Sequence, residues 1–277
     1  MAERPRTLLV VAGTGTEVGK TFVGAELCRL LIARGLVVAA RKPAQSGEPG
    51  DPTTDADELA AATGEDPMIV CPSHRRYSVA MAPPMAADAT GGDRILLNEL
   101  LAEVASSWPA RSVDVGLIEQ AGGVRSPHTH DADGVDVITA VAPDAVIVVA
   151  DAGLGTINSI RLTTAAIRSG FAGPIIVMLN RFDPDNDLHV ANRRWIEASD
   201  GPIGMVVTNI VELTDALIGR VIPRYCKGCG RRDSGCDGDC LPSLEPARHC
   251  GTCGRVVTVT VTPTGTSARC KVHGAVG

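Results

Sequence analysis

The fold of this chain is decided by Val10-Val11-Ala12-Gly13-Thr14-Gly15-Thr16-Glu17-Val18-Gly19-Lys20-Thr21. The apolar run from Thr7 to Ala12 predicts a buried parallel strand. Apolar side chains recur at helical spacing after Lys20, so a helix is expected there. A glycine-rich loop between a strand and a helix is typical of a phosphate-binding loop, because free backbone N–H groups and the helix dipole face an anion.

Within this loop, Lys20 is expected to reach the β- and γ-phosphates of a nucleotide, and the Thr21 hydroxyl is expected to bind Mg²⁺. The strict GxxxxGK[ST] pattern has glycine at the position of Thr14, which here lies between Gly13 and Gly15. The loop is therefore a variant of that pattern. A glycine-rich turn that binds no ligand is the alternative interpretation.

Length and charge limit the classes of protein to consider. A chain of 277 residues can bury a sizeable core in one large or two small domains. The formal net charge of −6 argues against general binding to nucleic acids or membrane surfaces. No segment approaches the roughly 18–20 apolar residues of a membrane span. The charged segment 1–6 leads directly into the first strand, so we expect no signal peptide and a cytoplasmic protein.

Strands and helices are predicted to alternate along residues 1–222. Beyond the first strand and helix, the expected strands are 36–40, 113–118, 144–150, 174–179 and 203–207. The expected helices are 56–62, 95–106, 133–141, 155–170 and 188–198, and segment 72–94 is expected to be irregular. This alternation predicts an α/β fold of the P-loop NTPase type, a parallel sheet flanked by helices. Ligands of such sheets bind beyond the carboxyl ends of the strands.

Two predicted strand ends carry charged residues. Lys42 follows the second strand, where Pro43 holds the backbone extended, and would place a positive charge beside a transferring phosphate. An ordinary surface lysine is the alternative. Glu119 ends the strand at 113–118 and precedes Gly122-Gly123, which suits an Mg²⁺ ligand close to substrate. The pair Asp55 and Asp57 can supply another oxygen, and spacing does not decide which of the two does so.

Two further strand ends are rich in glycine or polar residues. Gly155-Thr156-Ile157-Asn158 begins a predicted helix, whose start favours a carboxylate. Asn180-Arg181-Phe182-Asp183 can face a nucleotide base and is similar to the Asn-Lys-x-Asp motif of GTPases. The Asp-x-x-Gly motif of GTPases is not found after Asp151, which weakens that interpretation. A P-loop ATPase or GTPase switch protein nevertheless remains the alternative function.

The cysteines mark a separate tail. Of nine cysteines, Cys28 and Cys71 stand alone and the rest lie within residues 226–270. Such crowding in a cytosolic protein indicates metal binding. One pairing joins Cys226-x₂-Cys229 to Cys250-x₂-Cys253 at about zinc-ribbon spacing. The other pairing forms two sets, Cys226, Cys229, Cys236 and Cys240, and Cys250, Cys253, Cys270 and His273.

The metal of the tail is left open between zinc and an iron–sulfur cluster, because both bind sets of four cysteines. The tail has little apolar sequence with which to build a core, so a metal would supply stability. We therefore expect two domains, a nucleotide-binding domain over residues 1–222 and a small Cys-rich, metal-binding domain over residues 223–277.

The strand-end motifs resemble those of the dethiobiotin synthetase family. They are Gly13–Thr21, Lys42-Pro43-x-x-Ser46-Gly47, Glu119-x-Ala121-Gly122-Gly123 and Gly155–Asn158, in the family's order over about residues 7–222. The resemblance implies an enzyme that makes the ureido ring of dethiobiotin from 7,8-diaminononanoate, CO₂ and ATP with Mg²⁺. One substrate amine takes up CO₂ as a carbamate, the carbamate attacks the γ-phosphate to give a carbamoyl phosphate, and the second amine closes the ring.

The same resemblance implies roles for individual residues. Lys42, Thr16 and Ser46 hold the carbamate, and Lys20 and the loop Gly13–Thr21 hold ATP. Thr21, Asp55 and Glu119 gather around Mg²⁺, while Asn180 contacts adenine. The substrate also contacts Gly122, Gly123, Gly155, Thr156 and Asn158, the last three across a homodimer interface. One residue departs from the family pattern, because Gln120 stands where its members usually have glycine.

The tail has a resemblance of its own. Cys250-Gly-Thr-Cys253, Val261-Thr262-Pro263-x-Gly265 and Ala268-Arg269-Cys270-x-x-His273-Gly274 resemble the actinobacterial biotin synthase auxiliary protein over about residues 248–274. This resemblance implies biotin synthase as a partner and favours iron–sulfur chemistry. The alternative is a zinc-ribbon interaction module. The tail has an excess of Lys and Arg but no interleaved aromatic residues, so nucleic acid is not an expected partner.

Overall fold

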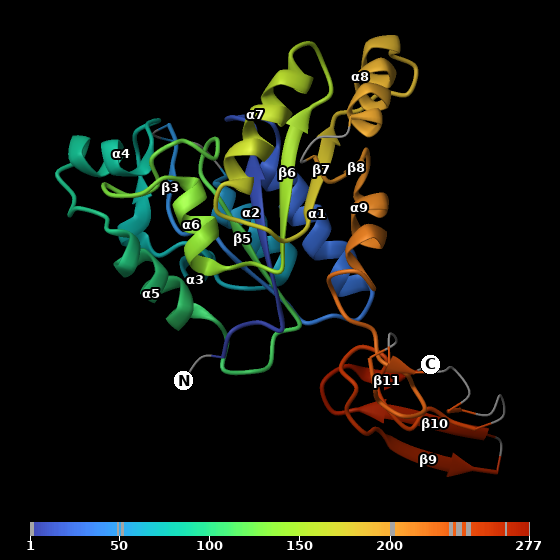
Figure 1. Cartoon of the computed structure of the whole chain (residues 1–277). Coiled ribbons are helices and arrows are strands. Elements are labelled where there is room, and N and C mark those ends of the chain that lie inside the picture. Colours follow the sequence, from blue (N-terminus) through green and yellow to red (C-terminus); the bar gives the residue numbers. More distant parts are fainter. Residues whose placement is uncertain are drawn as a thin grey trace.

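The computed structural model describes residues 3–48, 50, 53–199, 203–232, 235–236, 240–241, 245–263 and 265–276. Its centre is a six-stranded parallel sheet with the order β2-β5-β1-β6-β7-β8 (Figure 1). The strands are β1 (Thr7–Gly13), β2 (Val38–Arg41), β5 (Val115–Glu119), β6 (Ala145–Asp151), β7 (Ile175–Asn180) and β8 (Met205–Val207). The prediction of a parallel α/β sheet is confirmed.

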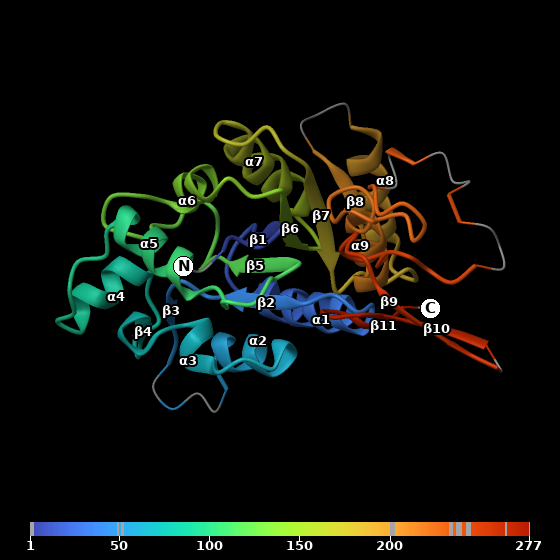
Figure 2. The same ribbon diagram turned by 90° about the horizontal axis from the view of Figure 1, so that it is seen from below.

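Helices cover both faces of this sheet because successive strand residues point to opposite sides. All of β1 is buried; Leu9 and Val11 enter one core cluster, and Val10 and Ala12 enter the other. The first cluster includes side chains of α1 (Lys20–Ala33), α2 (Asp55–Thr63) and α9 (Ile210–Leu217). The second includes side chains of α5 (Leu97–Ser107), α6 (Gly134–Val141), α7 (Thr156–Arg168) and α8 (Asp187–Ala198). Figure 2 shows α1 and α2 on one side of the sheet and α6 and α7 on the other.

The expectation that segment 72–94 is irregular is partly wrong. A 3₁₀ turn (Ser73–Arg75) leads into β4 (Arg76–Tyr77), which pairs in parallel with β3 (Gln45–Ser46). A helix then follows as α4 (Pro83–Ala89). Prolines are tolerated at the start of a helix, where the backbone N–H has no partner within the helix. A short helix, α3 (Pro67–Val70), was also not expected. The other predicted elements of the body exist, with ends shifted by a few residues.

The order of the strands places the glycine-rich loop at a crevice. The strand β1 has β5 on one side and β6 on the other, and the chain continues outward in both directions from this centre. Connections therefore diverge beyond the carboxyl end of β1, where ligands of open parallel sheets bind. The loop that follows β1 runs directly into α1 at this point.

The tail forms a small antiparallel sheet of β9 (Thr258–Thr262), β10 (Gly265–Cys270) and β11 (Gly274–Val276). The apolar run Val256–Val261 predicts only the first of these strands. The tail lies beyond the end of the sheet opposite to the strand arrowheads (Figure 1). Its buried cluster consists of Ala247, Cys250, Cys253, Val257, Ala268 and Cys270. Because half of these side chains are thiols, apolar burial alone holds this sheet weakly.

Among the described residues, no helix is both long enough and apolar enough to cross a bilayer.

Candidate active site

The glycine-rich loop wraps tightly around the side chain of Lys20. A Cβ at Gly13 would lie 2.9 Å from Lys20 Cδ and 3.0 Å from the Gly15 carbonyl oxygen, so a larger residue would displace the loop. The Lys20 ammonium donates a hydrogen bond to the Gly15 carbonyl at 2.8 Å. The helix α1 begins after Gly19, whose φ of +89° is readily adopted only by glycine. The loop therefore closes around Lys20 and lies between a strand and a helix, as the sequence predicted.

The ammonium of Lys20 is held at an unusual pKa. Burial lowers this pKa, and the positive charge of Lys42 lowers it further, to about 8. The carboxylates of Glu119 and Asp55 act in the opposite direction but offset only part of the effect. At neutral pH Lys20 is charged, yet it loses its proton far more readily than an exposed lysine.

Thr21 contacts two carboxylates that come from distant parts of the chain. Its Oγ1 lies 2.9 Å from Asp55 Oδ1 and 2.8 Å from Glu119 Oε1. The neighbouring Asp57 faces elsewhere, since its carboxylate accepts hydrogen bonds from the backbone and hydroxyl of Thr54 in a capping box at the start of α2. Of the two aspartates, Asp55 is therefore the one whose carboxylate lies beside Thr21.

Lys42 completes this cluster at the end of β2. Its Nζ lies 2.6 Å from Glu119 Oε1 and 2.7 Å from Asp55 Oδ2, and its side chain is almost fully buried. Burial alone would lower the pKa of Lys42, but the two carboxylates outweigh it and raise the pKa above the usual value for lysine. Lys42 is thus a permanently charged group beside the glycine-rich loop.

The oxygen atoms around Thr21 suit a hard divalent cation. Glu119 is fully buried, and its Oε2 has no hydrogen-bond partner among the described residues. An unpaired buried carboxylate oxygen is costly unless a cation or donor satisfies it. Two carboxylates and one hydroxyl are ligands that Mg²⁺ accepts, together with water and phosphate oxygens. Thr21, Asp55 and Glu119 therefore fit the ion that the sequence predicted.

The glycine pair after β5 lies against the glycine-rich loop. A Cβ at Gly122 would come within 3.9 Å of Thr16 Cγ2, and one at Gly123 would come within 3.6 Å of Gly15 Cα. Gly122 has a φ of +63° and a Cβ there would also lie 2.9 Å from Ser126 Oγ, so this turn requires glycine. Three predicted positions, Thr16, Gly122 and Gly123, are thereby brought together.

Gln120 lies directly after β5 and connects the same turn to α6. Its buried side chain donates a hydrogen bond to the Gly134 carbonyl at 2.6 Å, linking the end of β5 to the start of α6. The imidazole of His128 lies close by, since a Cβ at Gly134 would meet both Gln120 Oε1 and His128 Cε1. Burial lowers the pKa of His128. Sequence reasoning missed His128, because a single histidine in an irregular loop carries no spacing signal.

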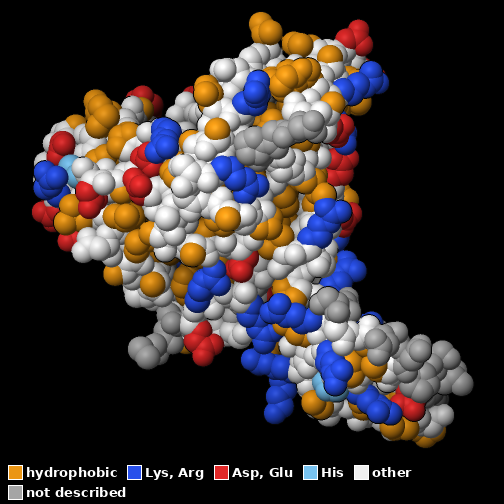
Figure 3. Space-filling view, in the orientation of Figure 1, with side chains coloured by type: hydrophobic (Ala, Val, Ile, Leu, Met, Phe, Trp, Pro, Cys, Tyr) orange, Lys and Arg blue, Asp and Glu red, His pale blue; other side chains and the backbone are white. Residues whose placement is uncertain are grey.

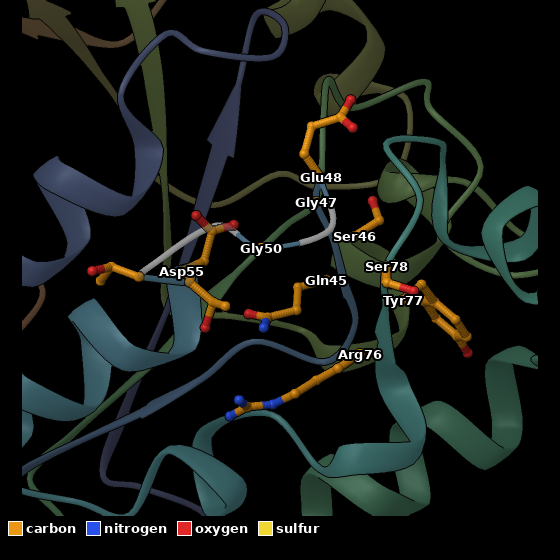
Figure 4. Close-up of a pocket in the computed structure, with 11 residues that line it drawn as sticks. Gln45, Ser46, Gly47, Glu48, Gly50, Asp55, Arg76, Tyr77 and Ser78 are labelled. Atoms are coloured by element: carbon orange, nitrogen blue, oxygen red, sulfur yellow. The ribbon is translucent and has the colours of Figure 1, made fainter.

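Ser46 and Asp55 line one hollow of about 300 Å³ beside the cluster (Figure 4). In this view Asp55 lies on one side, and Tyr77 of β4 and the following Ser78 lie on the other. The hydroxyl of Ser46 donates to the Met81 carbonyl at 2.5 Å. The pairing of β3 with β4 builds this wall, so the segment expected to be irregular supplies part of the site.

The remaining predicted residues lie at the ends of β6 and β7. Asn180 Nδ2 donates to the Val18 carbonyl at 3.0 Å, so this side chain braces the glycine-rich loop. Thr156 is buried and its hydroxyl donates to the Asp151 carbonyl, whereas Asn158 is exposed. No hydrogen bond or ion pair between described residues joins Gly155, Thr156 or Asn158 to Lys42 or Ser46.

The tail brings its seven cysteines and His273 together as two sets of four side chains. The ligand atoms of Cys226, Cys229, Cys236 and Cys240 lie within 4.8 Å of one another, and so do those of Cys250, Cys253, Cys270 and His273. The side chains therefore group as in the pairing into two sets, and the two CxxC motifs lie in different sets. In the second set, burial would raise the pKa of Cys270, but backbone N–H groups of His273 and Val272 lower it to about 6.

Comparison with known proteins supports a functional assignment for the body. The profile of the family described as "AAA domain" matches residues 6–215. An ATP-dependent dethiobiotin synthetase BioD from Streptomyces avermitilis is 40% identical over 174 residues, which cover 61% of this chain and 71% of that protein. A protein of the same name from Caulobacter vibrioides is 37% identical over 183 residues, which cover 65% of this chain and 83% of that protein.

Similarity to solved structures is weaker. A plasmid partition protein from Borrelia burgdorferi aligns with 76% of this chain and 96% of its own, at 13% identity and a TM-score of 0.47. A likeness at that level supports no argument about this chain.

The low pKa of Lys20 predicts that nucleotide binding takes up a proton near pH 8.5. The phosphates of ATP raise the pKa of Lys20 on binding, so a fraction of the lysines that were neutral become charged. Calorimetric titrations in two buffers of different ionisation enthalpy measure this uptake, which should disappear at pH 6.5. The Lys20→Met variant is the control, and equal heats in both buffers at pH 8.5 would contradict the prediction.

The geometry also predicts different outcomes for two neighbouring aspartates. Asp55→Ala removes an oxygen beside Thr21 and should raise the Mg²⁺ concentration for half-maximal activity by about tenfold or more. Asp57→Ala removes a helix cap and should cost about 1 kcal/mol of folding free energy without changing the Mg²⁺ requirement. Mg²⁺ titrations and thermal unfolding of both variants check this, and a reversed pattern would refute the assignment.

Proposed function

The chain belongs to the ATP-dependent dethiobiotin synthetase family, and on that premise we propose that it closes the ureido ring of dethiobiotin from 7,8-diaminononanoate, CO₂ and ATP. It is an ATP-dependent ligase. In the proposed reaction one substrate amine first takes up CO₂ as a carbamate. The carbamate oxygen then attacks the γ-phosphate, whose bond to ADP breaks, and this gives a carbamoyl phosphate and ADP. The second amine closes the ring and expels phosphate.

The observation that carries the proposal is the position of the Lys42 ammonium. It contacts the same two carboxylates that contact Thr21, so it faces the phosphate end of the glycine-rich loop. Phosphoryl transfer depends on placing reactants and stabilising charge more than on a strong base. A lysine that stays protonated there can hold an anionic carbamate and stabilise the charge that develops on the transferring phosphate.

Other residues of the site take supporting roles in this proposal. Lys20 and the N–H groups of the loop bind the phosphates, and Asn180 contacts the base while bracing the loop through Val18. Thr16 and Ser46 orient the carbamate. Thr21, Asp55 and Glu119 would hold Mg²⁺, which neutralises phosphate charge when it is bound. The diamine would occupy the hollow beside Ser46.

We propose that the enzyme is a homodimer that works in the cytoplasm. At the start of α7, Leu154 is 93% exposed, and Leu162 within the helix is 65% exposed. Large apolar side chains exposed beside the predicted turn Gly155–Asn158 favour contact with a second copy, which would bring that turn to the neighbouring site. Cys28 and Cys71 of the body form no disulfide, which suits a reducing compartment.

For residues 223–277 we propose a metal-binding domain that assists biotin synthase. The clustering of the two ligand sets supports metal binding, and the resemblance of residues 248–274 to the auxiliary protein supports the partner. Zinc and an iron–sulfur cluster are both compatible with these ligand types.

Lys42→Ala should abolish most diamine-dependent turnover. Loss of one group that stabilises developing charge costs about 3–4 kcal/mol, or roughly a hundredfold to a thousandfold in kcat. The measurement is ADP release with the diamine and bicarbonate, with Lys271→Ala in the tail as the matched control. Near-normal turnover by Lys42→Ala would exclude the role proposed for this residue. ADP release independent of the diamine would instead favour a nucleotide-dependent switch.

Metal content tests the proposal for the tail. Anaerobically purified full-length protein should carry about two metal ions, or clusters, per chain, because each ligand set is complete. Elemental analysis and the visible spectrum distinguish zinc from iron–sulfur. Variants with Cys229→Ser or Cys253→Ser should each lose one site and keep the other. Protein with neither zinc nor iron would exclude a metal-binding tail.

A further inference from the structure

A buried polar contact joins the tail to the body. His273 Nε2 lies 2.6 Å from Asp114 Oδ2, and both side chains are about 95% buried. Asp114 stands directly before β5, at the end of the sheet away from the nucleotide loop. Figure 3 shows Lys and Arg side chains gathered where the tail joins the body. The contact is therefore a specific carboxylate–imidazole pair at a junction that is otherwise rich in positive charge.

The other nitrogen of His273 belongs to the second ligand set of the tail. Its Nδ1 lies 3.4 Å from Cys250 Sγ and 3.6 Å from Cys270 Sγ, and Cys253 Sγ lies 3.8 Å from Cys270 Sγ. A tetrahedral ion with metal–sulfur bonds of about 2.3 Å separates its ligands by about 3.8 Å. Iron–sulfur clusters distribute their thiolates over more than one iron and need wider spacing. The second set therefore fits a single ion such as zinc.

The contact with Asp114 selects the form of the imidazole that can bind metal. The carboxylate accepts a hydrogen bond from Nε2–H, so the proton stays on Nε2 and the lone pair of Nδ1 is directed at the three thiols. The same contact orients the ring. In metal sites such second carboxylates raise the basicity of the histidine and strengthen binding.

Asp114 is itself held firmly by the body. Its Oδ2 also accepts the Val37 backbone N–H at 2.9 Å. Arg6 Nη1 lies 3.8 Å from Asp114 Oδ1 and donates a hydrogen bond to the Cys253 carbonyl at 3.4 Å. The body thus contacts the side chain of one ligand of the second set, His273, and the backbone of another, Cys253.

We propose that Asp114 is a positioning residue for a single tetrahedral metal ion bound by Cys250, Cys253, Cys270 and His273, and that this ion docks the tail on the amino-terminal edge of the body's sheet. The inference rests on the metal binding proposed above for the tail. Docking at this edge leaves the nucleotide loop, at the carboxyl ends of the strands, open to substrates. The two sites then lie at opposite ends of the same strand, because β5 begins after Asp114 and ends at Glu119.

Cobalt(II) titration of the full chain tests the positioning role. Cys226→Ser and Cys229→Ser together disable the first set, so the visible bands of tetrahedral cobalt report the second set alone. On this background Asp114→Asn should weaken cobalt binding about 10- to 100-fold. The matched control is Asp144→Asn, because Asp144 also precedes a strand and accepts a backbone N–H, from Leu8, at the same edge. Equal cobalt affinity in the background protein, in its Asp114→Asn variant and in its Asp144→Asn variant would overturn the inference.

A second variant separates docking from metal binding. His273→Cys keeps four ligands but removes the group that reaches Asp114, so the site should still fill with cobalt. Trypsin should then cut after the exposed Arg224 several-fold faster than in the metal-loaded protein with His273. Unchanged cleavage would refute docking through this contact. Failure of the background protein to bind any cobalt would exclude the metal site itself, a different outcome from equal binding with and without Asp114.

Discussion

The arrangement of the site depends on one buried ammonium group shared by two carboxylates. Lys42 Nζ bonds both Glu119 and Asp55, and the three residues come from the ends of β2 and β5 and the start of α2. Removing the charge of Lys42 would leave the fully buried carboxylate of Glu119 without its cation, which costs several kcal/mol. This requirement ties the three elements together around the glycine-rich loop and determines where Thr21 lies.

The same charges account for the electrostatics of the loop. Two lysines and two carboxylates nearly cancel, so the pocket offers a triphosphate little net positive charge. Lys20 lies beside Lys42 in a buried environment, and its pKa falls to about 8 for that reason. A divalent cation at Thr21 would supply the missing positive charge and satisfy the free oxygen of Glu119. The family's use of ATP is thus consistent with the charge balance of this chain.

The tail is stabilised by a different kind of interaction. Its buried cluster is small and half of it is made of thiols, so side-chain burial contributes little. Metal ligation can replace that contribution, and the contact of His273 with Asp114 connects such a site to the body. The strand β5 serves both ends of the molecule, since Asp114 precedes it and Glu119 ends it.

The sequence by itself determined the alternation of strands and helices, the glycine-rich loop and the candidate residues at the strand ends, because these follow from local periodicity and from the conformations that glycine and proline allow. It did not reveal α4 behind its two prolines, and it left open both the choice between Asp55 and Asp57 and the choice between the two cysteine pairings. Nor did it indicate the contact between His273 and Asp114, which lie far apart in the chain. Only the tertiary structure decided these, because each depends on which side chains meet in space once the sheet is assembled.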